Sequence, residues 1–407
     1  MPGRRLFLLL LLGGAALVSL LMVAYGPDRT WRLWNIPTMR PLFADARSIT
    51  AGAESSRAGF DPLVRNPADP WQRVMNYPRA WQAVFRLGLD QRDTVAVAVV
   101  MMAAFVAGLF LFVDRIERRT AGLLALGLFS PAVMLALERA NICLLVFFLC
   151  AAALAVLRRS DVAAALLLTL AGTLMYYPFL GLVCLARADR RRCLWLGGVG
   201  VVTGLLYIAL TWTDVRHVLR GIDRGTFMSY GCSVGWMAAR QLGGSPATVV
   251  AVATVCALLL AGAIAALVLA ARRNLRPAAA PVPHHLDGFR LGAAIYLGTF
   301  LLGNNWDYRL MFTLFCLPQL ADWSRDARPG LARLARLTLV VLLLSLWGQF
   351  LFRFARFLPG AGYTMLGLDE TDNWLLWGCL LALVPAALPG WVRWGRRAAG
   401  GAPVGAA

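Results

Sequence analysis

The 407-residue sequence has little charge. Only 15% of its residues are Asp, Glu, Lys or Arg, whereas 59% are hydrophobic and the mean hydropathy is +0.66. A soluble domain would carry charge on about a quarter of its residues. Long apolar runs recur near the ~18–20 residues needed to cross a bilayer. These features exclude an ordinary soluble protein and predict a polytopic membrane protein.

Lysine is absent, so all 40 basic residues are arginine, and the formal net charge is +19. We attribute this bias to base composition. The arginines gather in short turns between apolar runs, which is typical of the cytoplasmic loops of an inserted protein. A nucleic-acid-binding surface would need a continuous basic face with aromatic platforms, and the sequence has none. We therefore expect a membrane-lipid environment and no nucleic-acid partner.

Metal-binding and nucleotide-binding motifs are also missing from the sequence. The eight cysteines include no CxxC pair, and most lie in apolar runs, where cysteine behaves as a small hydrophobe. The three histidines have no partner at helical spacing. GxSxG, GxGxxG and phosphate-loop patterns are absent from suitable contexts. No metal ligand or certain cofactor is assigned, although a divalent cation could assist if several outer carboxylates converge.

The apolar runs predict an all-α integral membrane protein with about 10–12 transmembrane helices, some of them short or broken. We place these helices in one domain, residues 1–392, followed by a basic cytoplasmic tail, residues 393–407. The run 6–25 is interpreted as the first transmembrane helix rather than a signal peptide, because it is long and lacks a small-residue cleavage site. The arginine turns predict that both termini are cytoplasmic.

Several segments receive more specific predictions. Residues 121–137 form one span. The later run 163–186 breaks at Tyr176-Tyr177-Pro178, since proline removes a backbone donor. Two short spans flank the polar hairpin 304–309. We expect three connections outside the membrane: a first extracytoplasmic loop with surface helices at 26–93, a mobile cytoplasmic turn at 272–290 and an outer loop at 353–372.

The long insert 26–93 gathers acidic and aromatic residues on the outer face. Asp45 could take a proton from an acceptor hydroxyl as a general base, with Asp69 as the next candidate, or it could be a solvated loop residue. Asp69, Trp71, Asn76 and Tyr77 suit sugar binding, because pyranose rings offer both CH faces and hydroxyls. The same rings could instead anchor the loop at the lipid headgroups.

Two further turns carry polar side chains. Arg139 could hold a phosphate that Glu138 orients, or the two residues could cap an interfacial turn. Arg309, held by Asp307, is a second candidate for a phosphate contact, and the alternative is a buried pair joining two short helices. The proposed substrate-binding residues are Arg47, Asp69, Trp71, Asn76, Tyr77, Glu138, Arg139, Asn141, Tyr177, Asn305, Asp307, Tyr308 and Arg309, with Asp45 as the catalytic residue.

The same motifs resemble a known family. The sequence is similar to bacterial GT-C glycosyltransferases, and most closely to the polyprenol-phosphate-mannose-dependent α-1,2-mannosyltransferase-like group. The resemblance covers most of the chain. It is carried by Phe43-Ala44-Asp45, Asp69-Pro70-Trp71, Asn76-Tyr77-Pro78, Glu138-Arg139-Ala140-Asn141, Tyr177-Pro178 and Asp307-Tyr308-Arg309.

The resemblance implies a hexosyltransferase of the bacterial inner membrane that functions in envelope biogenesis. The donor would be a sugar on a polyprenyl phosphate, the acceptor a glycan or lipid-linked hydroxyl, and transfer would invert the anomeric centre on the extracytoplasmic face. Asp45 matches the expected catalytic base. The chain departs from the family pattern at Ala140 and Cys143, where relatives often have Gly and Asp, and at Met175-Tyr176-Tyr177, where a lysine is frequent.

Two other functions fit the sequence. A transporter or flippase for a lipid-linked or polar solute would also have broken helices and intramembrane polar residues, but it predicts internal repeats, and none is found. An inactive scaffold of an envelope-assembly complex would agree with the missing lysine. Sugar transfer by the purified protein would exclude the scaffold.

Overall fold

A computed structural model shows an all-α protein. It describes residues 2–114, 116–187, 189–222, 224–272, 277, 280–357, 361–389 and 391, with only the backbone described for 266–272, 355–356 and 361–363. The predicted basic tail 393–407 lies outside these residues.

The first half of the chain forms α1 (Pro2–Leu33), α2 (Ala44–Arg57), η1 (Arg79–Leu87), η2 (Gln91–Asp93), α3 (Thr94–Phe112), α4 (Arg118–Leu128), α5 (Pro131–Arg139), α6 (Cys143–Val156), α7 (Asp161–Met175), η3 (Tyr177–Arg187) and α8 (Arg190–Leu210).

The second half forms α9 (Trp212–Gly221), β1 (Ser229–Tyr230), α10 (Val234–Gln241), α11 (Pro246–Arg272), α12 (Pro283–Leu301), β2 (Asn305–Trp306), η4 (Asp307–Cys316), α13 (Leu317–Trp323), α14 (Pro329–Leu351), η5 (Phe352–Phe357) and α15 (Ala361–Ala387). The strands β1 and β2 pair antiparallel over two residues each.

Five helices among the described residues are long and apolar enough to cross a membrane. Their ranges are Pro2–Leu33, Gln91–Phe112, Arg190–Leu210, Pro246–Ala265 and Pro329–Phe354, and the bent pair α4 and α5 would make a sixth crossing. Shorter apolar helices, α6, α7 and η3, pack between them. The protein is therefore a multi-pass helical membrane protein.

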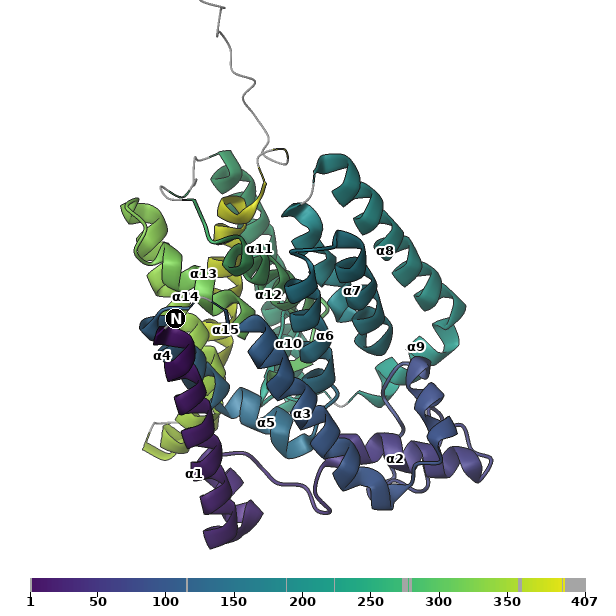
Figure 1. The fold of residues 1–407 in the computed structure, drawn as a ribbon. Helices are drawn as coiled ribbons and strands as arrows, with labels where there is room; N and C mark the ends of the chain where they lie inside the picture. The colour runs from purple at the N-terminus through teal and green to yellow at the C-terminus, as the bar shows by residue number, and fades with distance from the viewer. Residues whose placement is uncertain are drawn as a thin grey trace, which may run out of the picture.

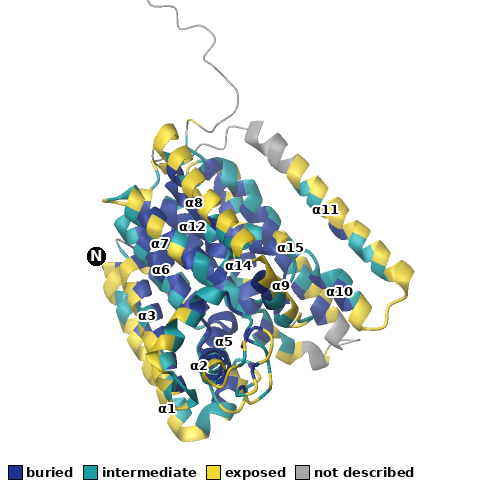
Figure 2. Cartoon of the chain, turned by 90° about the vertical axis from the view of Figure 1, so that its right-hand side faces the viewer, coloured by how far each residue is buried: buried dark blue, intermediate teal, exposed yellow. Residues whose placement is uncertain are grey.

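The inner helices form an aromatic core. Phe147 of α6 stacks on Phe315 of η4 with ring centroids 4.4 Å apart, and Phe112 of α3 meets the same ring edge-on at 4.9 Å. In contrast, α1, α8 and α11 present mostly exposed apolar side chains (Figure 2). A helix that is apolar on nearly every face and little buried in protein suits contact with lipid.

The expected span 121–137 is not one continuous helix, although α4 and α5 together would still make one crossing. The chain bends by 51° between α4 and α5. Ser130 and Pro131 cause the break, because proline cannot donate to the preceding turn and is favoured at the first position of a new helix. The expected break at Tyr176 is confirmed, since α7 ends at Met175 and η3 begins at Tyr177.

Two expected connections are helical. Helix α12 begins at Pro283, so the predicted mobile turn 272–290 is wrong for residues 283–290. Buried Asp287 pairs with Arg290 in α12 at 3.0 Å and with Arg187 at 3.2 Å, which fixes this turn in the bundle. Helix α15 begins at Ala361, so the predicted outer loop 353–372 is also wrong over its second half.

The two ends of the bundle differ in structure. Figure 1 shows α2 and α9 at one end, and the turns after α3, α6 and η3 at the other. Ion pairs join these turns and their flanking helices, as in Arg158–Asp114 at 2.9 Å and Arg192–Asp161 at 3.2 Å. The arginine-rich turns thus lie opposite the end that carries α2.

Helix α12 lies unusually close to the backbone of η4. A Cβ atom on Gly292 would lie 2.7 Å from the Phe312 carbonyl oxygen, and one on Gly288 would lie 2.9 Å from the Phe315 carbonyl oxygen. Such contacts involve backbone atoms, which cannot move aside as a side chain can. The glycines therefore determine how closely α12 and η4 pack.

We expect Gly292→Ala to destabilise the protein by about 1–3 kcal/mol, because the added methyl group overpacks this contact. Thermal unfolding of the purified protein in detergent measures the change. Gly122→Ala in α4 is the matched control, because no atom lies within 4 Å of its added Cβ. Equal unfolding temperatures for the two variants would contradict the close packing of α12 on η4.

Candidate functional site

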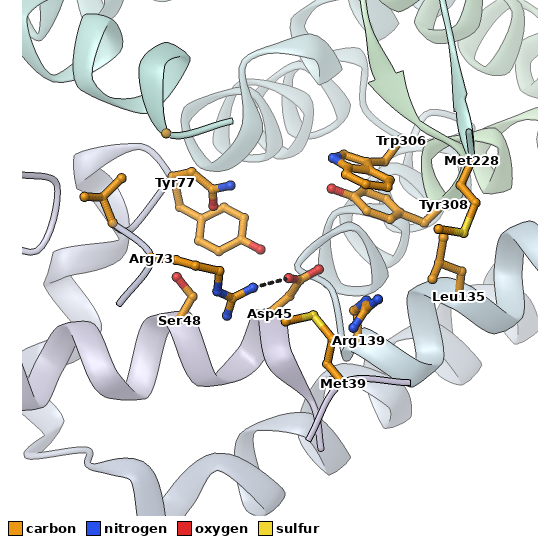
Figure 3. Close-up of a pocket in the computed structure, with 13 residues that line it drawn as sticks. Met39, Asp45, Ser48, Arg73, Tyr77, Leu135, Arg139, Met228, Trp306 and Tyr308 are labelled. Atoms are coloured by element: carbon orange, nitrogen blue, oxygen red, sulfur yellow. Dashed lines mark ion pairs between the residues drawn. The ribbon is translucent and has the colours of Figure 1, made fainter. Parts of the chain in front are cut away.

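A cavity of about 150 Å³ opens at the end of the bundle that carries α2. It is called the polar cavity below. Segments far apart in the sequence converge on it (Figure 3). Its walls are formed by Met39, Asp45, Ser48, Arg73, Val74, Asn76, Tyr77, Leu135, Arg139, Gly221, Met228, Trp306 and Tyr308.

Asp45 lies in the first turn of α2, at the edge of the polar cavity. Small side chains place this helix: Ala46 packs in one cluster with Ala98 of α3 and with Ala140, which ends α5. The helix dipole stabilises a negative charge in the first turn. The Asp45 side chain is 17% exposed and points into the cavity rather than into bulk solvent (Figure 3).

Asn141 fixes one oxygen of the Asp45 carboxylate. The Asn141 side-chain nitrogen donates to Asp45 Oδ2 at 2.6 Å, and its Oδ1 accepts the Cys143 backbone N–H at 2.9 Å. Because the second bond occupies the amide oxygen, the amide nitrogen must face the carboxylate. The preceding Ala140 has left-handed backbone angles (φ 45°, ψ 53°) that favour glycine, the residue expected here from the family resemblance.

Arg73 approaches the other oxygen. Its Nη1 lies 3.6 Å from Asp45 Oδ1, and its Nη2 lies 3.1 Å from Asp69 Oδ2 and donates to the Ala44 carbonyl at 2.5 Å. Burial alone would lower the pKa of Arg73, but the charges of Asp69 and Asp45 outweigh it and raise that pKa. The guanidinium therefore remains a fixed positive charge beside Asp45.

Arg139 supplies a second positive charge. Its Nε contacts Glu138 Oε2 at 3.1 Å and its Nη2 donates to the Pro37 carbonyl at 3.2 Å. Its Nη1 is buried and has no hydrogen-bond partner. A buried donor without a partner is costly, so a bound anion on this nitrogen would be favourable.

Two tyrosines, Tyr77 and Tyr308, complete the polar wall (Figure 3). Burial, followed by the charge of Asp45, raises the pKa of Tyr77 well above its usual value. Tyr77 therefore keeps its proton at neutral pH and can donate a hydrogen bond to a ligand.

Five of the residues proposed from the sequence line the polar cavity: Asp45, Asn76, Tyr77, Arg139 and Tyr308. Three others, Asn141, Asp69 and Trp71, support it from behind, and Asn141 does so through its bond to Asp45. Asp69 accepts the backbone N–H groups of Trp71 and Arg73 and pairs with the Arg73 side chain, and the Trp71 ring lies 4.7 Å from the Arg73 guanidinium. Asp69 therefore positions Arg73.

The remaining proposed residues have other contacts. Arg47 donates to Gln91 Oε1 at 3.2 Å, and Glu138 Oε1 accepts the Met39 backbone N–H at 3.0 Å. Tyr177 Oη lies 3.1 Å from Cys143 Sγ. None of these three side chains lines the polar cavity.

The expected pairing of Arg309 with Asp307 is wrong. Arg309 Nη1 instead donates to the side-chain oxygen of Asn305, and its guanidinium lies 5.2 Å from the Tyr177 ring centroid. Asp307 accepts from Gln349 Nε2 at 3.3 Å. The 3₁₀ turn after β2 directs these neighbouring side chains to different elements, so neither lines the polar cavity.

Arg73 and Trp306 are the main cavity residues absent from the proposed set. Arg73 has a sequence signal, because it follows Asp69 at the i,i+4 spacing that favours an ion pair. Trp306 lies within the polar hairpin 304–309 close to Tyr308, whereas Tyr77, the third aromatic residue of the cavity wall, is more than 200 positions away in sequence. Sequence spacing gives no sign of that convergence.

A second, apolar cavity of about 390 Å³ lies against the polar one and is called the apolar groove below. Both cavities are lined by residues of α5. On α5, Leu135 and Arg139 line the polar cavity, whereas Met134, Leu137 and Glu138 line the groove. The rest of the groove is formed by α1, α3, α4 and the segment around Phe43, so it lies beside membrane-spanning helices.

Among the described residues, no group of three or more His, Cys, Asp or Glu side chains lies close enough to hold a metal ion. Comparison of this chain with protein-family models, with curated proteins and with solved structures finds no match to any of them.

Proposed function

We propose that the protein is a membrane glycosyltransferase that transfers a sugar from a polyprenyl phosphate to an acceptor hydroxyl. The observation that carries the proposal is the polar cavity, where one carboxylate, Asp45, lies beside two guanidinium groups, Arg73 and Arg139. A base next to fixed positive charge suits a reaction that removes a proton and releases a phosphate.

In the proposed reaction, Asp45 takes the proton of the acceptor hydroxyl. The acceptor oxygen forms a bond to the anomeric carbon of the sugar, on the face opposite the phosphate. The bond between that carbon and the phosphate oxygen breaks, and its electron pair leaves with the polyprenyl phosphate. Arg73 and Arg139 stabilise the leaving anion, and Asn141 keeps the Asp45 carboxylate oriented. The single displacement inverts the anomeric centre.

The apolar groove supports a lipid-linked donor. Its lining is almost wholly hydrocarbon and extends along α1 and α3, while Glu138 and Phe43 bring it next to the polar cavity. An isoprenoid chain is an apolar ligand of suitable shape, and its burial is favourable at about 25 cal/mol per Å² of apolar surface. The chain would lie in the groove and place its phosphate near Arg139.

The charge distribution supports an extracytoplasmic site. The arginine-rich turns lie at the end of the bundle opposite α2, and such turns are retained on the cytoplasmic side. The polar cavity would then open to the outer face of a bacterial inner membrane. A glycan or lipid-linked acceptor would reach it there.

We expect Asp45→Asn to lower transfer by about 10²–10⁴-fold, because the amide cannot accept the acceptor proton. The measurement is transfer of labelled sugar from polyprenyl phosphate in vesicles that contain the purified protein. Asp61→Asn is the control, since its 39%-exposed side chain pairs with Arg79 outside the cavity. Transfer by the Asp45→Asn protein at the wild-type rate would exclude Asp45 as the base, and solute uptake without transfer would favour a transporter.

We expect Ala15→Trp to reduce transfer from a full-length polyprenyl donor about tenfold or more, because the indole fills the apolar groove lined by Ala15. Transfer from a donor with a truncated chain should change little. Ala16→Trp is the matched control, because Ala16 is exposed on α1 and does not line the groove. If Ala15→Trp affects both donors equally, the groove does not bind the donor chain.

A further inference from the structure

One face of α14 contacts three carboxylates that the proposed reaction does not use. Ser345 Oγ donates to Asp372 Oδ2 at 2.5 Å, and Gln349 Nε2 donates to Asp307 Oδ2 at 3.3 Å. Between Ser345 and Gln349, Gly348 lets Asp369 come close to the helix. A Cβ atom on Gly348 would lie 2.8 Å from Asp369 Oδ1. Asp307, Asp369 and Asp372 are called the acidic stripe below.

Two of these carboxylates are buried and lack full hydrogen bonding, whereas Asp372 is partly exposed. Asp307 is 4% exposed and Asp369 is 9% exposed. Asp307 Oδ1 and Asp369 Oδ2 have no hydrogen-bond partner. Asp369 and Asp372 also line a mostly apolar cavity of about 280 Å³ between α14 and α15. Two buried acceptors without donors therefore lie along one helix face.

No basic side chain compensates the acidic stripe in the described part of the chain. The ion pairs found there include none to Asp307, Asp369 or Asp372, although their neighbour Arg309 is nearby and donates to Asn305. The titratable groups near the stripe are Tyr230 of β1, Tyr296 of α12, and Glu370 and Cys379 of α15, and Cys232 and Cys256 lie near Glu370. None of these is a cation.

Two buried carboxylates and the partly buried Asp372, none of them ion-paired, cannot all carry charge at acceptable cost, because desolvating even one ion costs several kcal/mol. They must bind either a metal ion or protons. Among the described residues, no three acidic, His or Cys groups have a geometry that could hold a metal. The proton is the remaining cation, and protonation removes the charge that burial makes costly.

We propose that Asp307, Asp369 and Asp372 form a proton-binding site within the helical bundle. At neutral pH the buried carboxyl groups of this site are protonated, and they release their protons in alkaline conditions. Asp307 lies between Trp306 and Tyr308 in sequence, and both of these line the polar cavity, although Asp307 itself does not. Negative charge on Asp307 would lie behind the wall that receives an anionic headgroup. The proton site itself does not require the transfer reaction.

The test compares thermal unfolding of the full-length protein in detergent between pH 5.5 and 9. We expect the wild-type unfolding temperature to fall by about 5 °C or more over this range, because ionisation at high pH puts uncompensated charge in the fold. The double variant Asp369→Asn/Asp372→Asn mimics the neutral state, so its unfolding temperature should fall by less than half as much over the same pH range. Glu117→Gln is the matched control, since its 60%-exposed side chain pairs with Arg325, and it should retain the wild-type pH dependence.

A second readout detects the protons directly. The infrared carbonyl band of protonated carboxyl groups should be present in the wild type at pH 7 and weaker in the single variant Asp369→Asn, which keeps most of the packing. Wild-type stability that is independent of pH, or an unchanged band in the variant, would overturn the proposal. Stabilisation by Na⁺ but not by choline at pH 9 would also overturn it, because a metal ion would then occupy the site.

Discussion

The candidate site depends on the way one carboxylate is held from two sides. Asn141 binds one oxygen of Asp45 and Arg73 approaches the other, so the carboxylate has a single orientation before any ligand arrives. Each partner is fixed in turn, Asn141 by the Cys143 backbone and Arg73 by Asp69. Such support is what a reactive group needs in order to keep its geometry through a reaction.

This arrangement links the soluble-looking insert to the membrane helices. Asp45, Asp69 and Arg73 come from the insert, whereas Asn141 comes from the turn between α5 and α6. The hydrogen bond from Asn141 to Asp45 is therefore also a contact between two layers of the structure. The small residues Ala46, Ala98 and Ala140 bring those layers close enough for it to form.

The sequence predicted the fold class well, because long apolar runs and arginine turns are strong local signals. The break before Pro178 was predicted because proline removes a backbone hydrogen-bond donor. The bend at Ser130 and Pro131 was not, since the apolar pattern continues across it. The helical start of α15 was also missed, because Asp369, Glu370 and Asp372 give residues 361–372 the composition of a loop.

The site was predicted in part. Asp45, Arg139 and Tyr308 were selected from local clusters, and the structure brings them to one cavity. The partner of Arg309 could not be predicted, because in a tight turn the direction of each side chain depends on backbone angles rather than on adjacency in sequence. Arg73 was overlooked, although its spacing from Asp69 indicates an ion pair.

Helix α5 is nine residues long and lies between the bend at Pro131 and the left-handed Ala140. One side of it lines the apolar groove and another side presents Arg139 to the polar cavity. A rigid rod this short cannot turn on one side only. Any ligand that rotates α5 from the apolar groove must therefore move the Arg139 guanidinium as well. Filling the groove and positioning the positive charge in the polar cavity are thus coupled through one short helix.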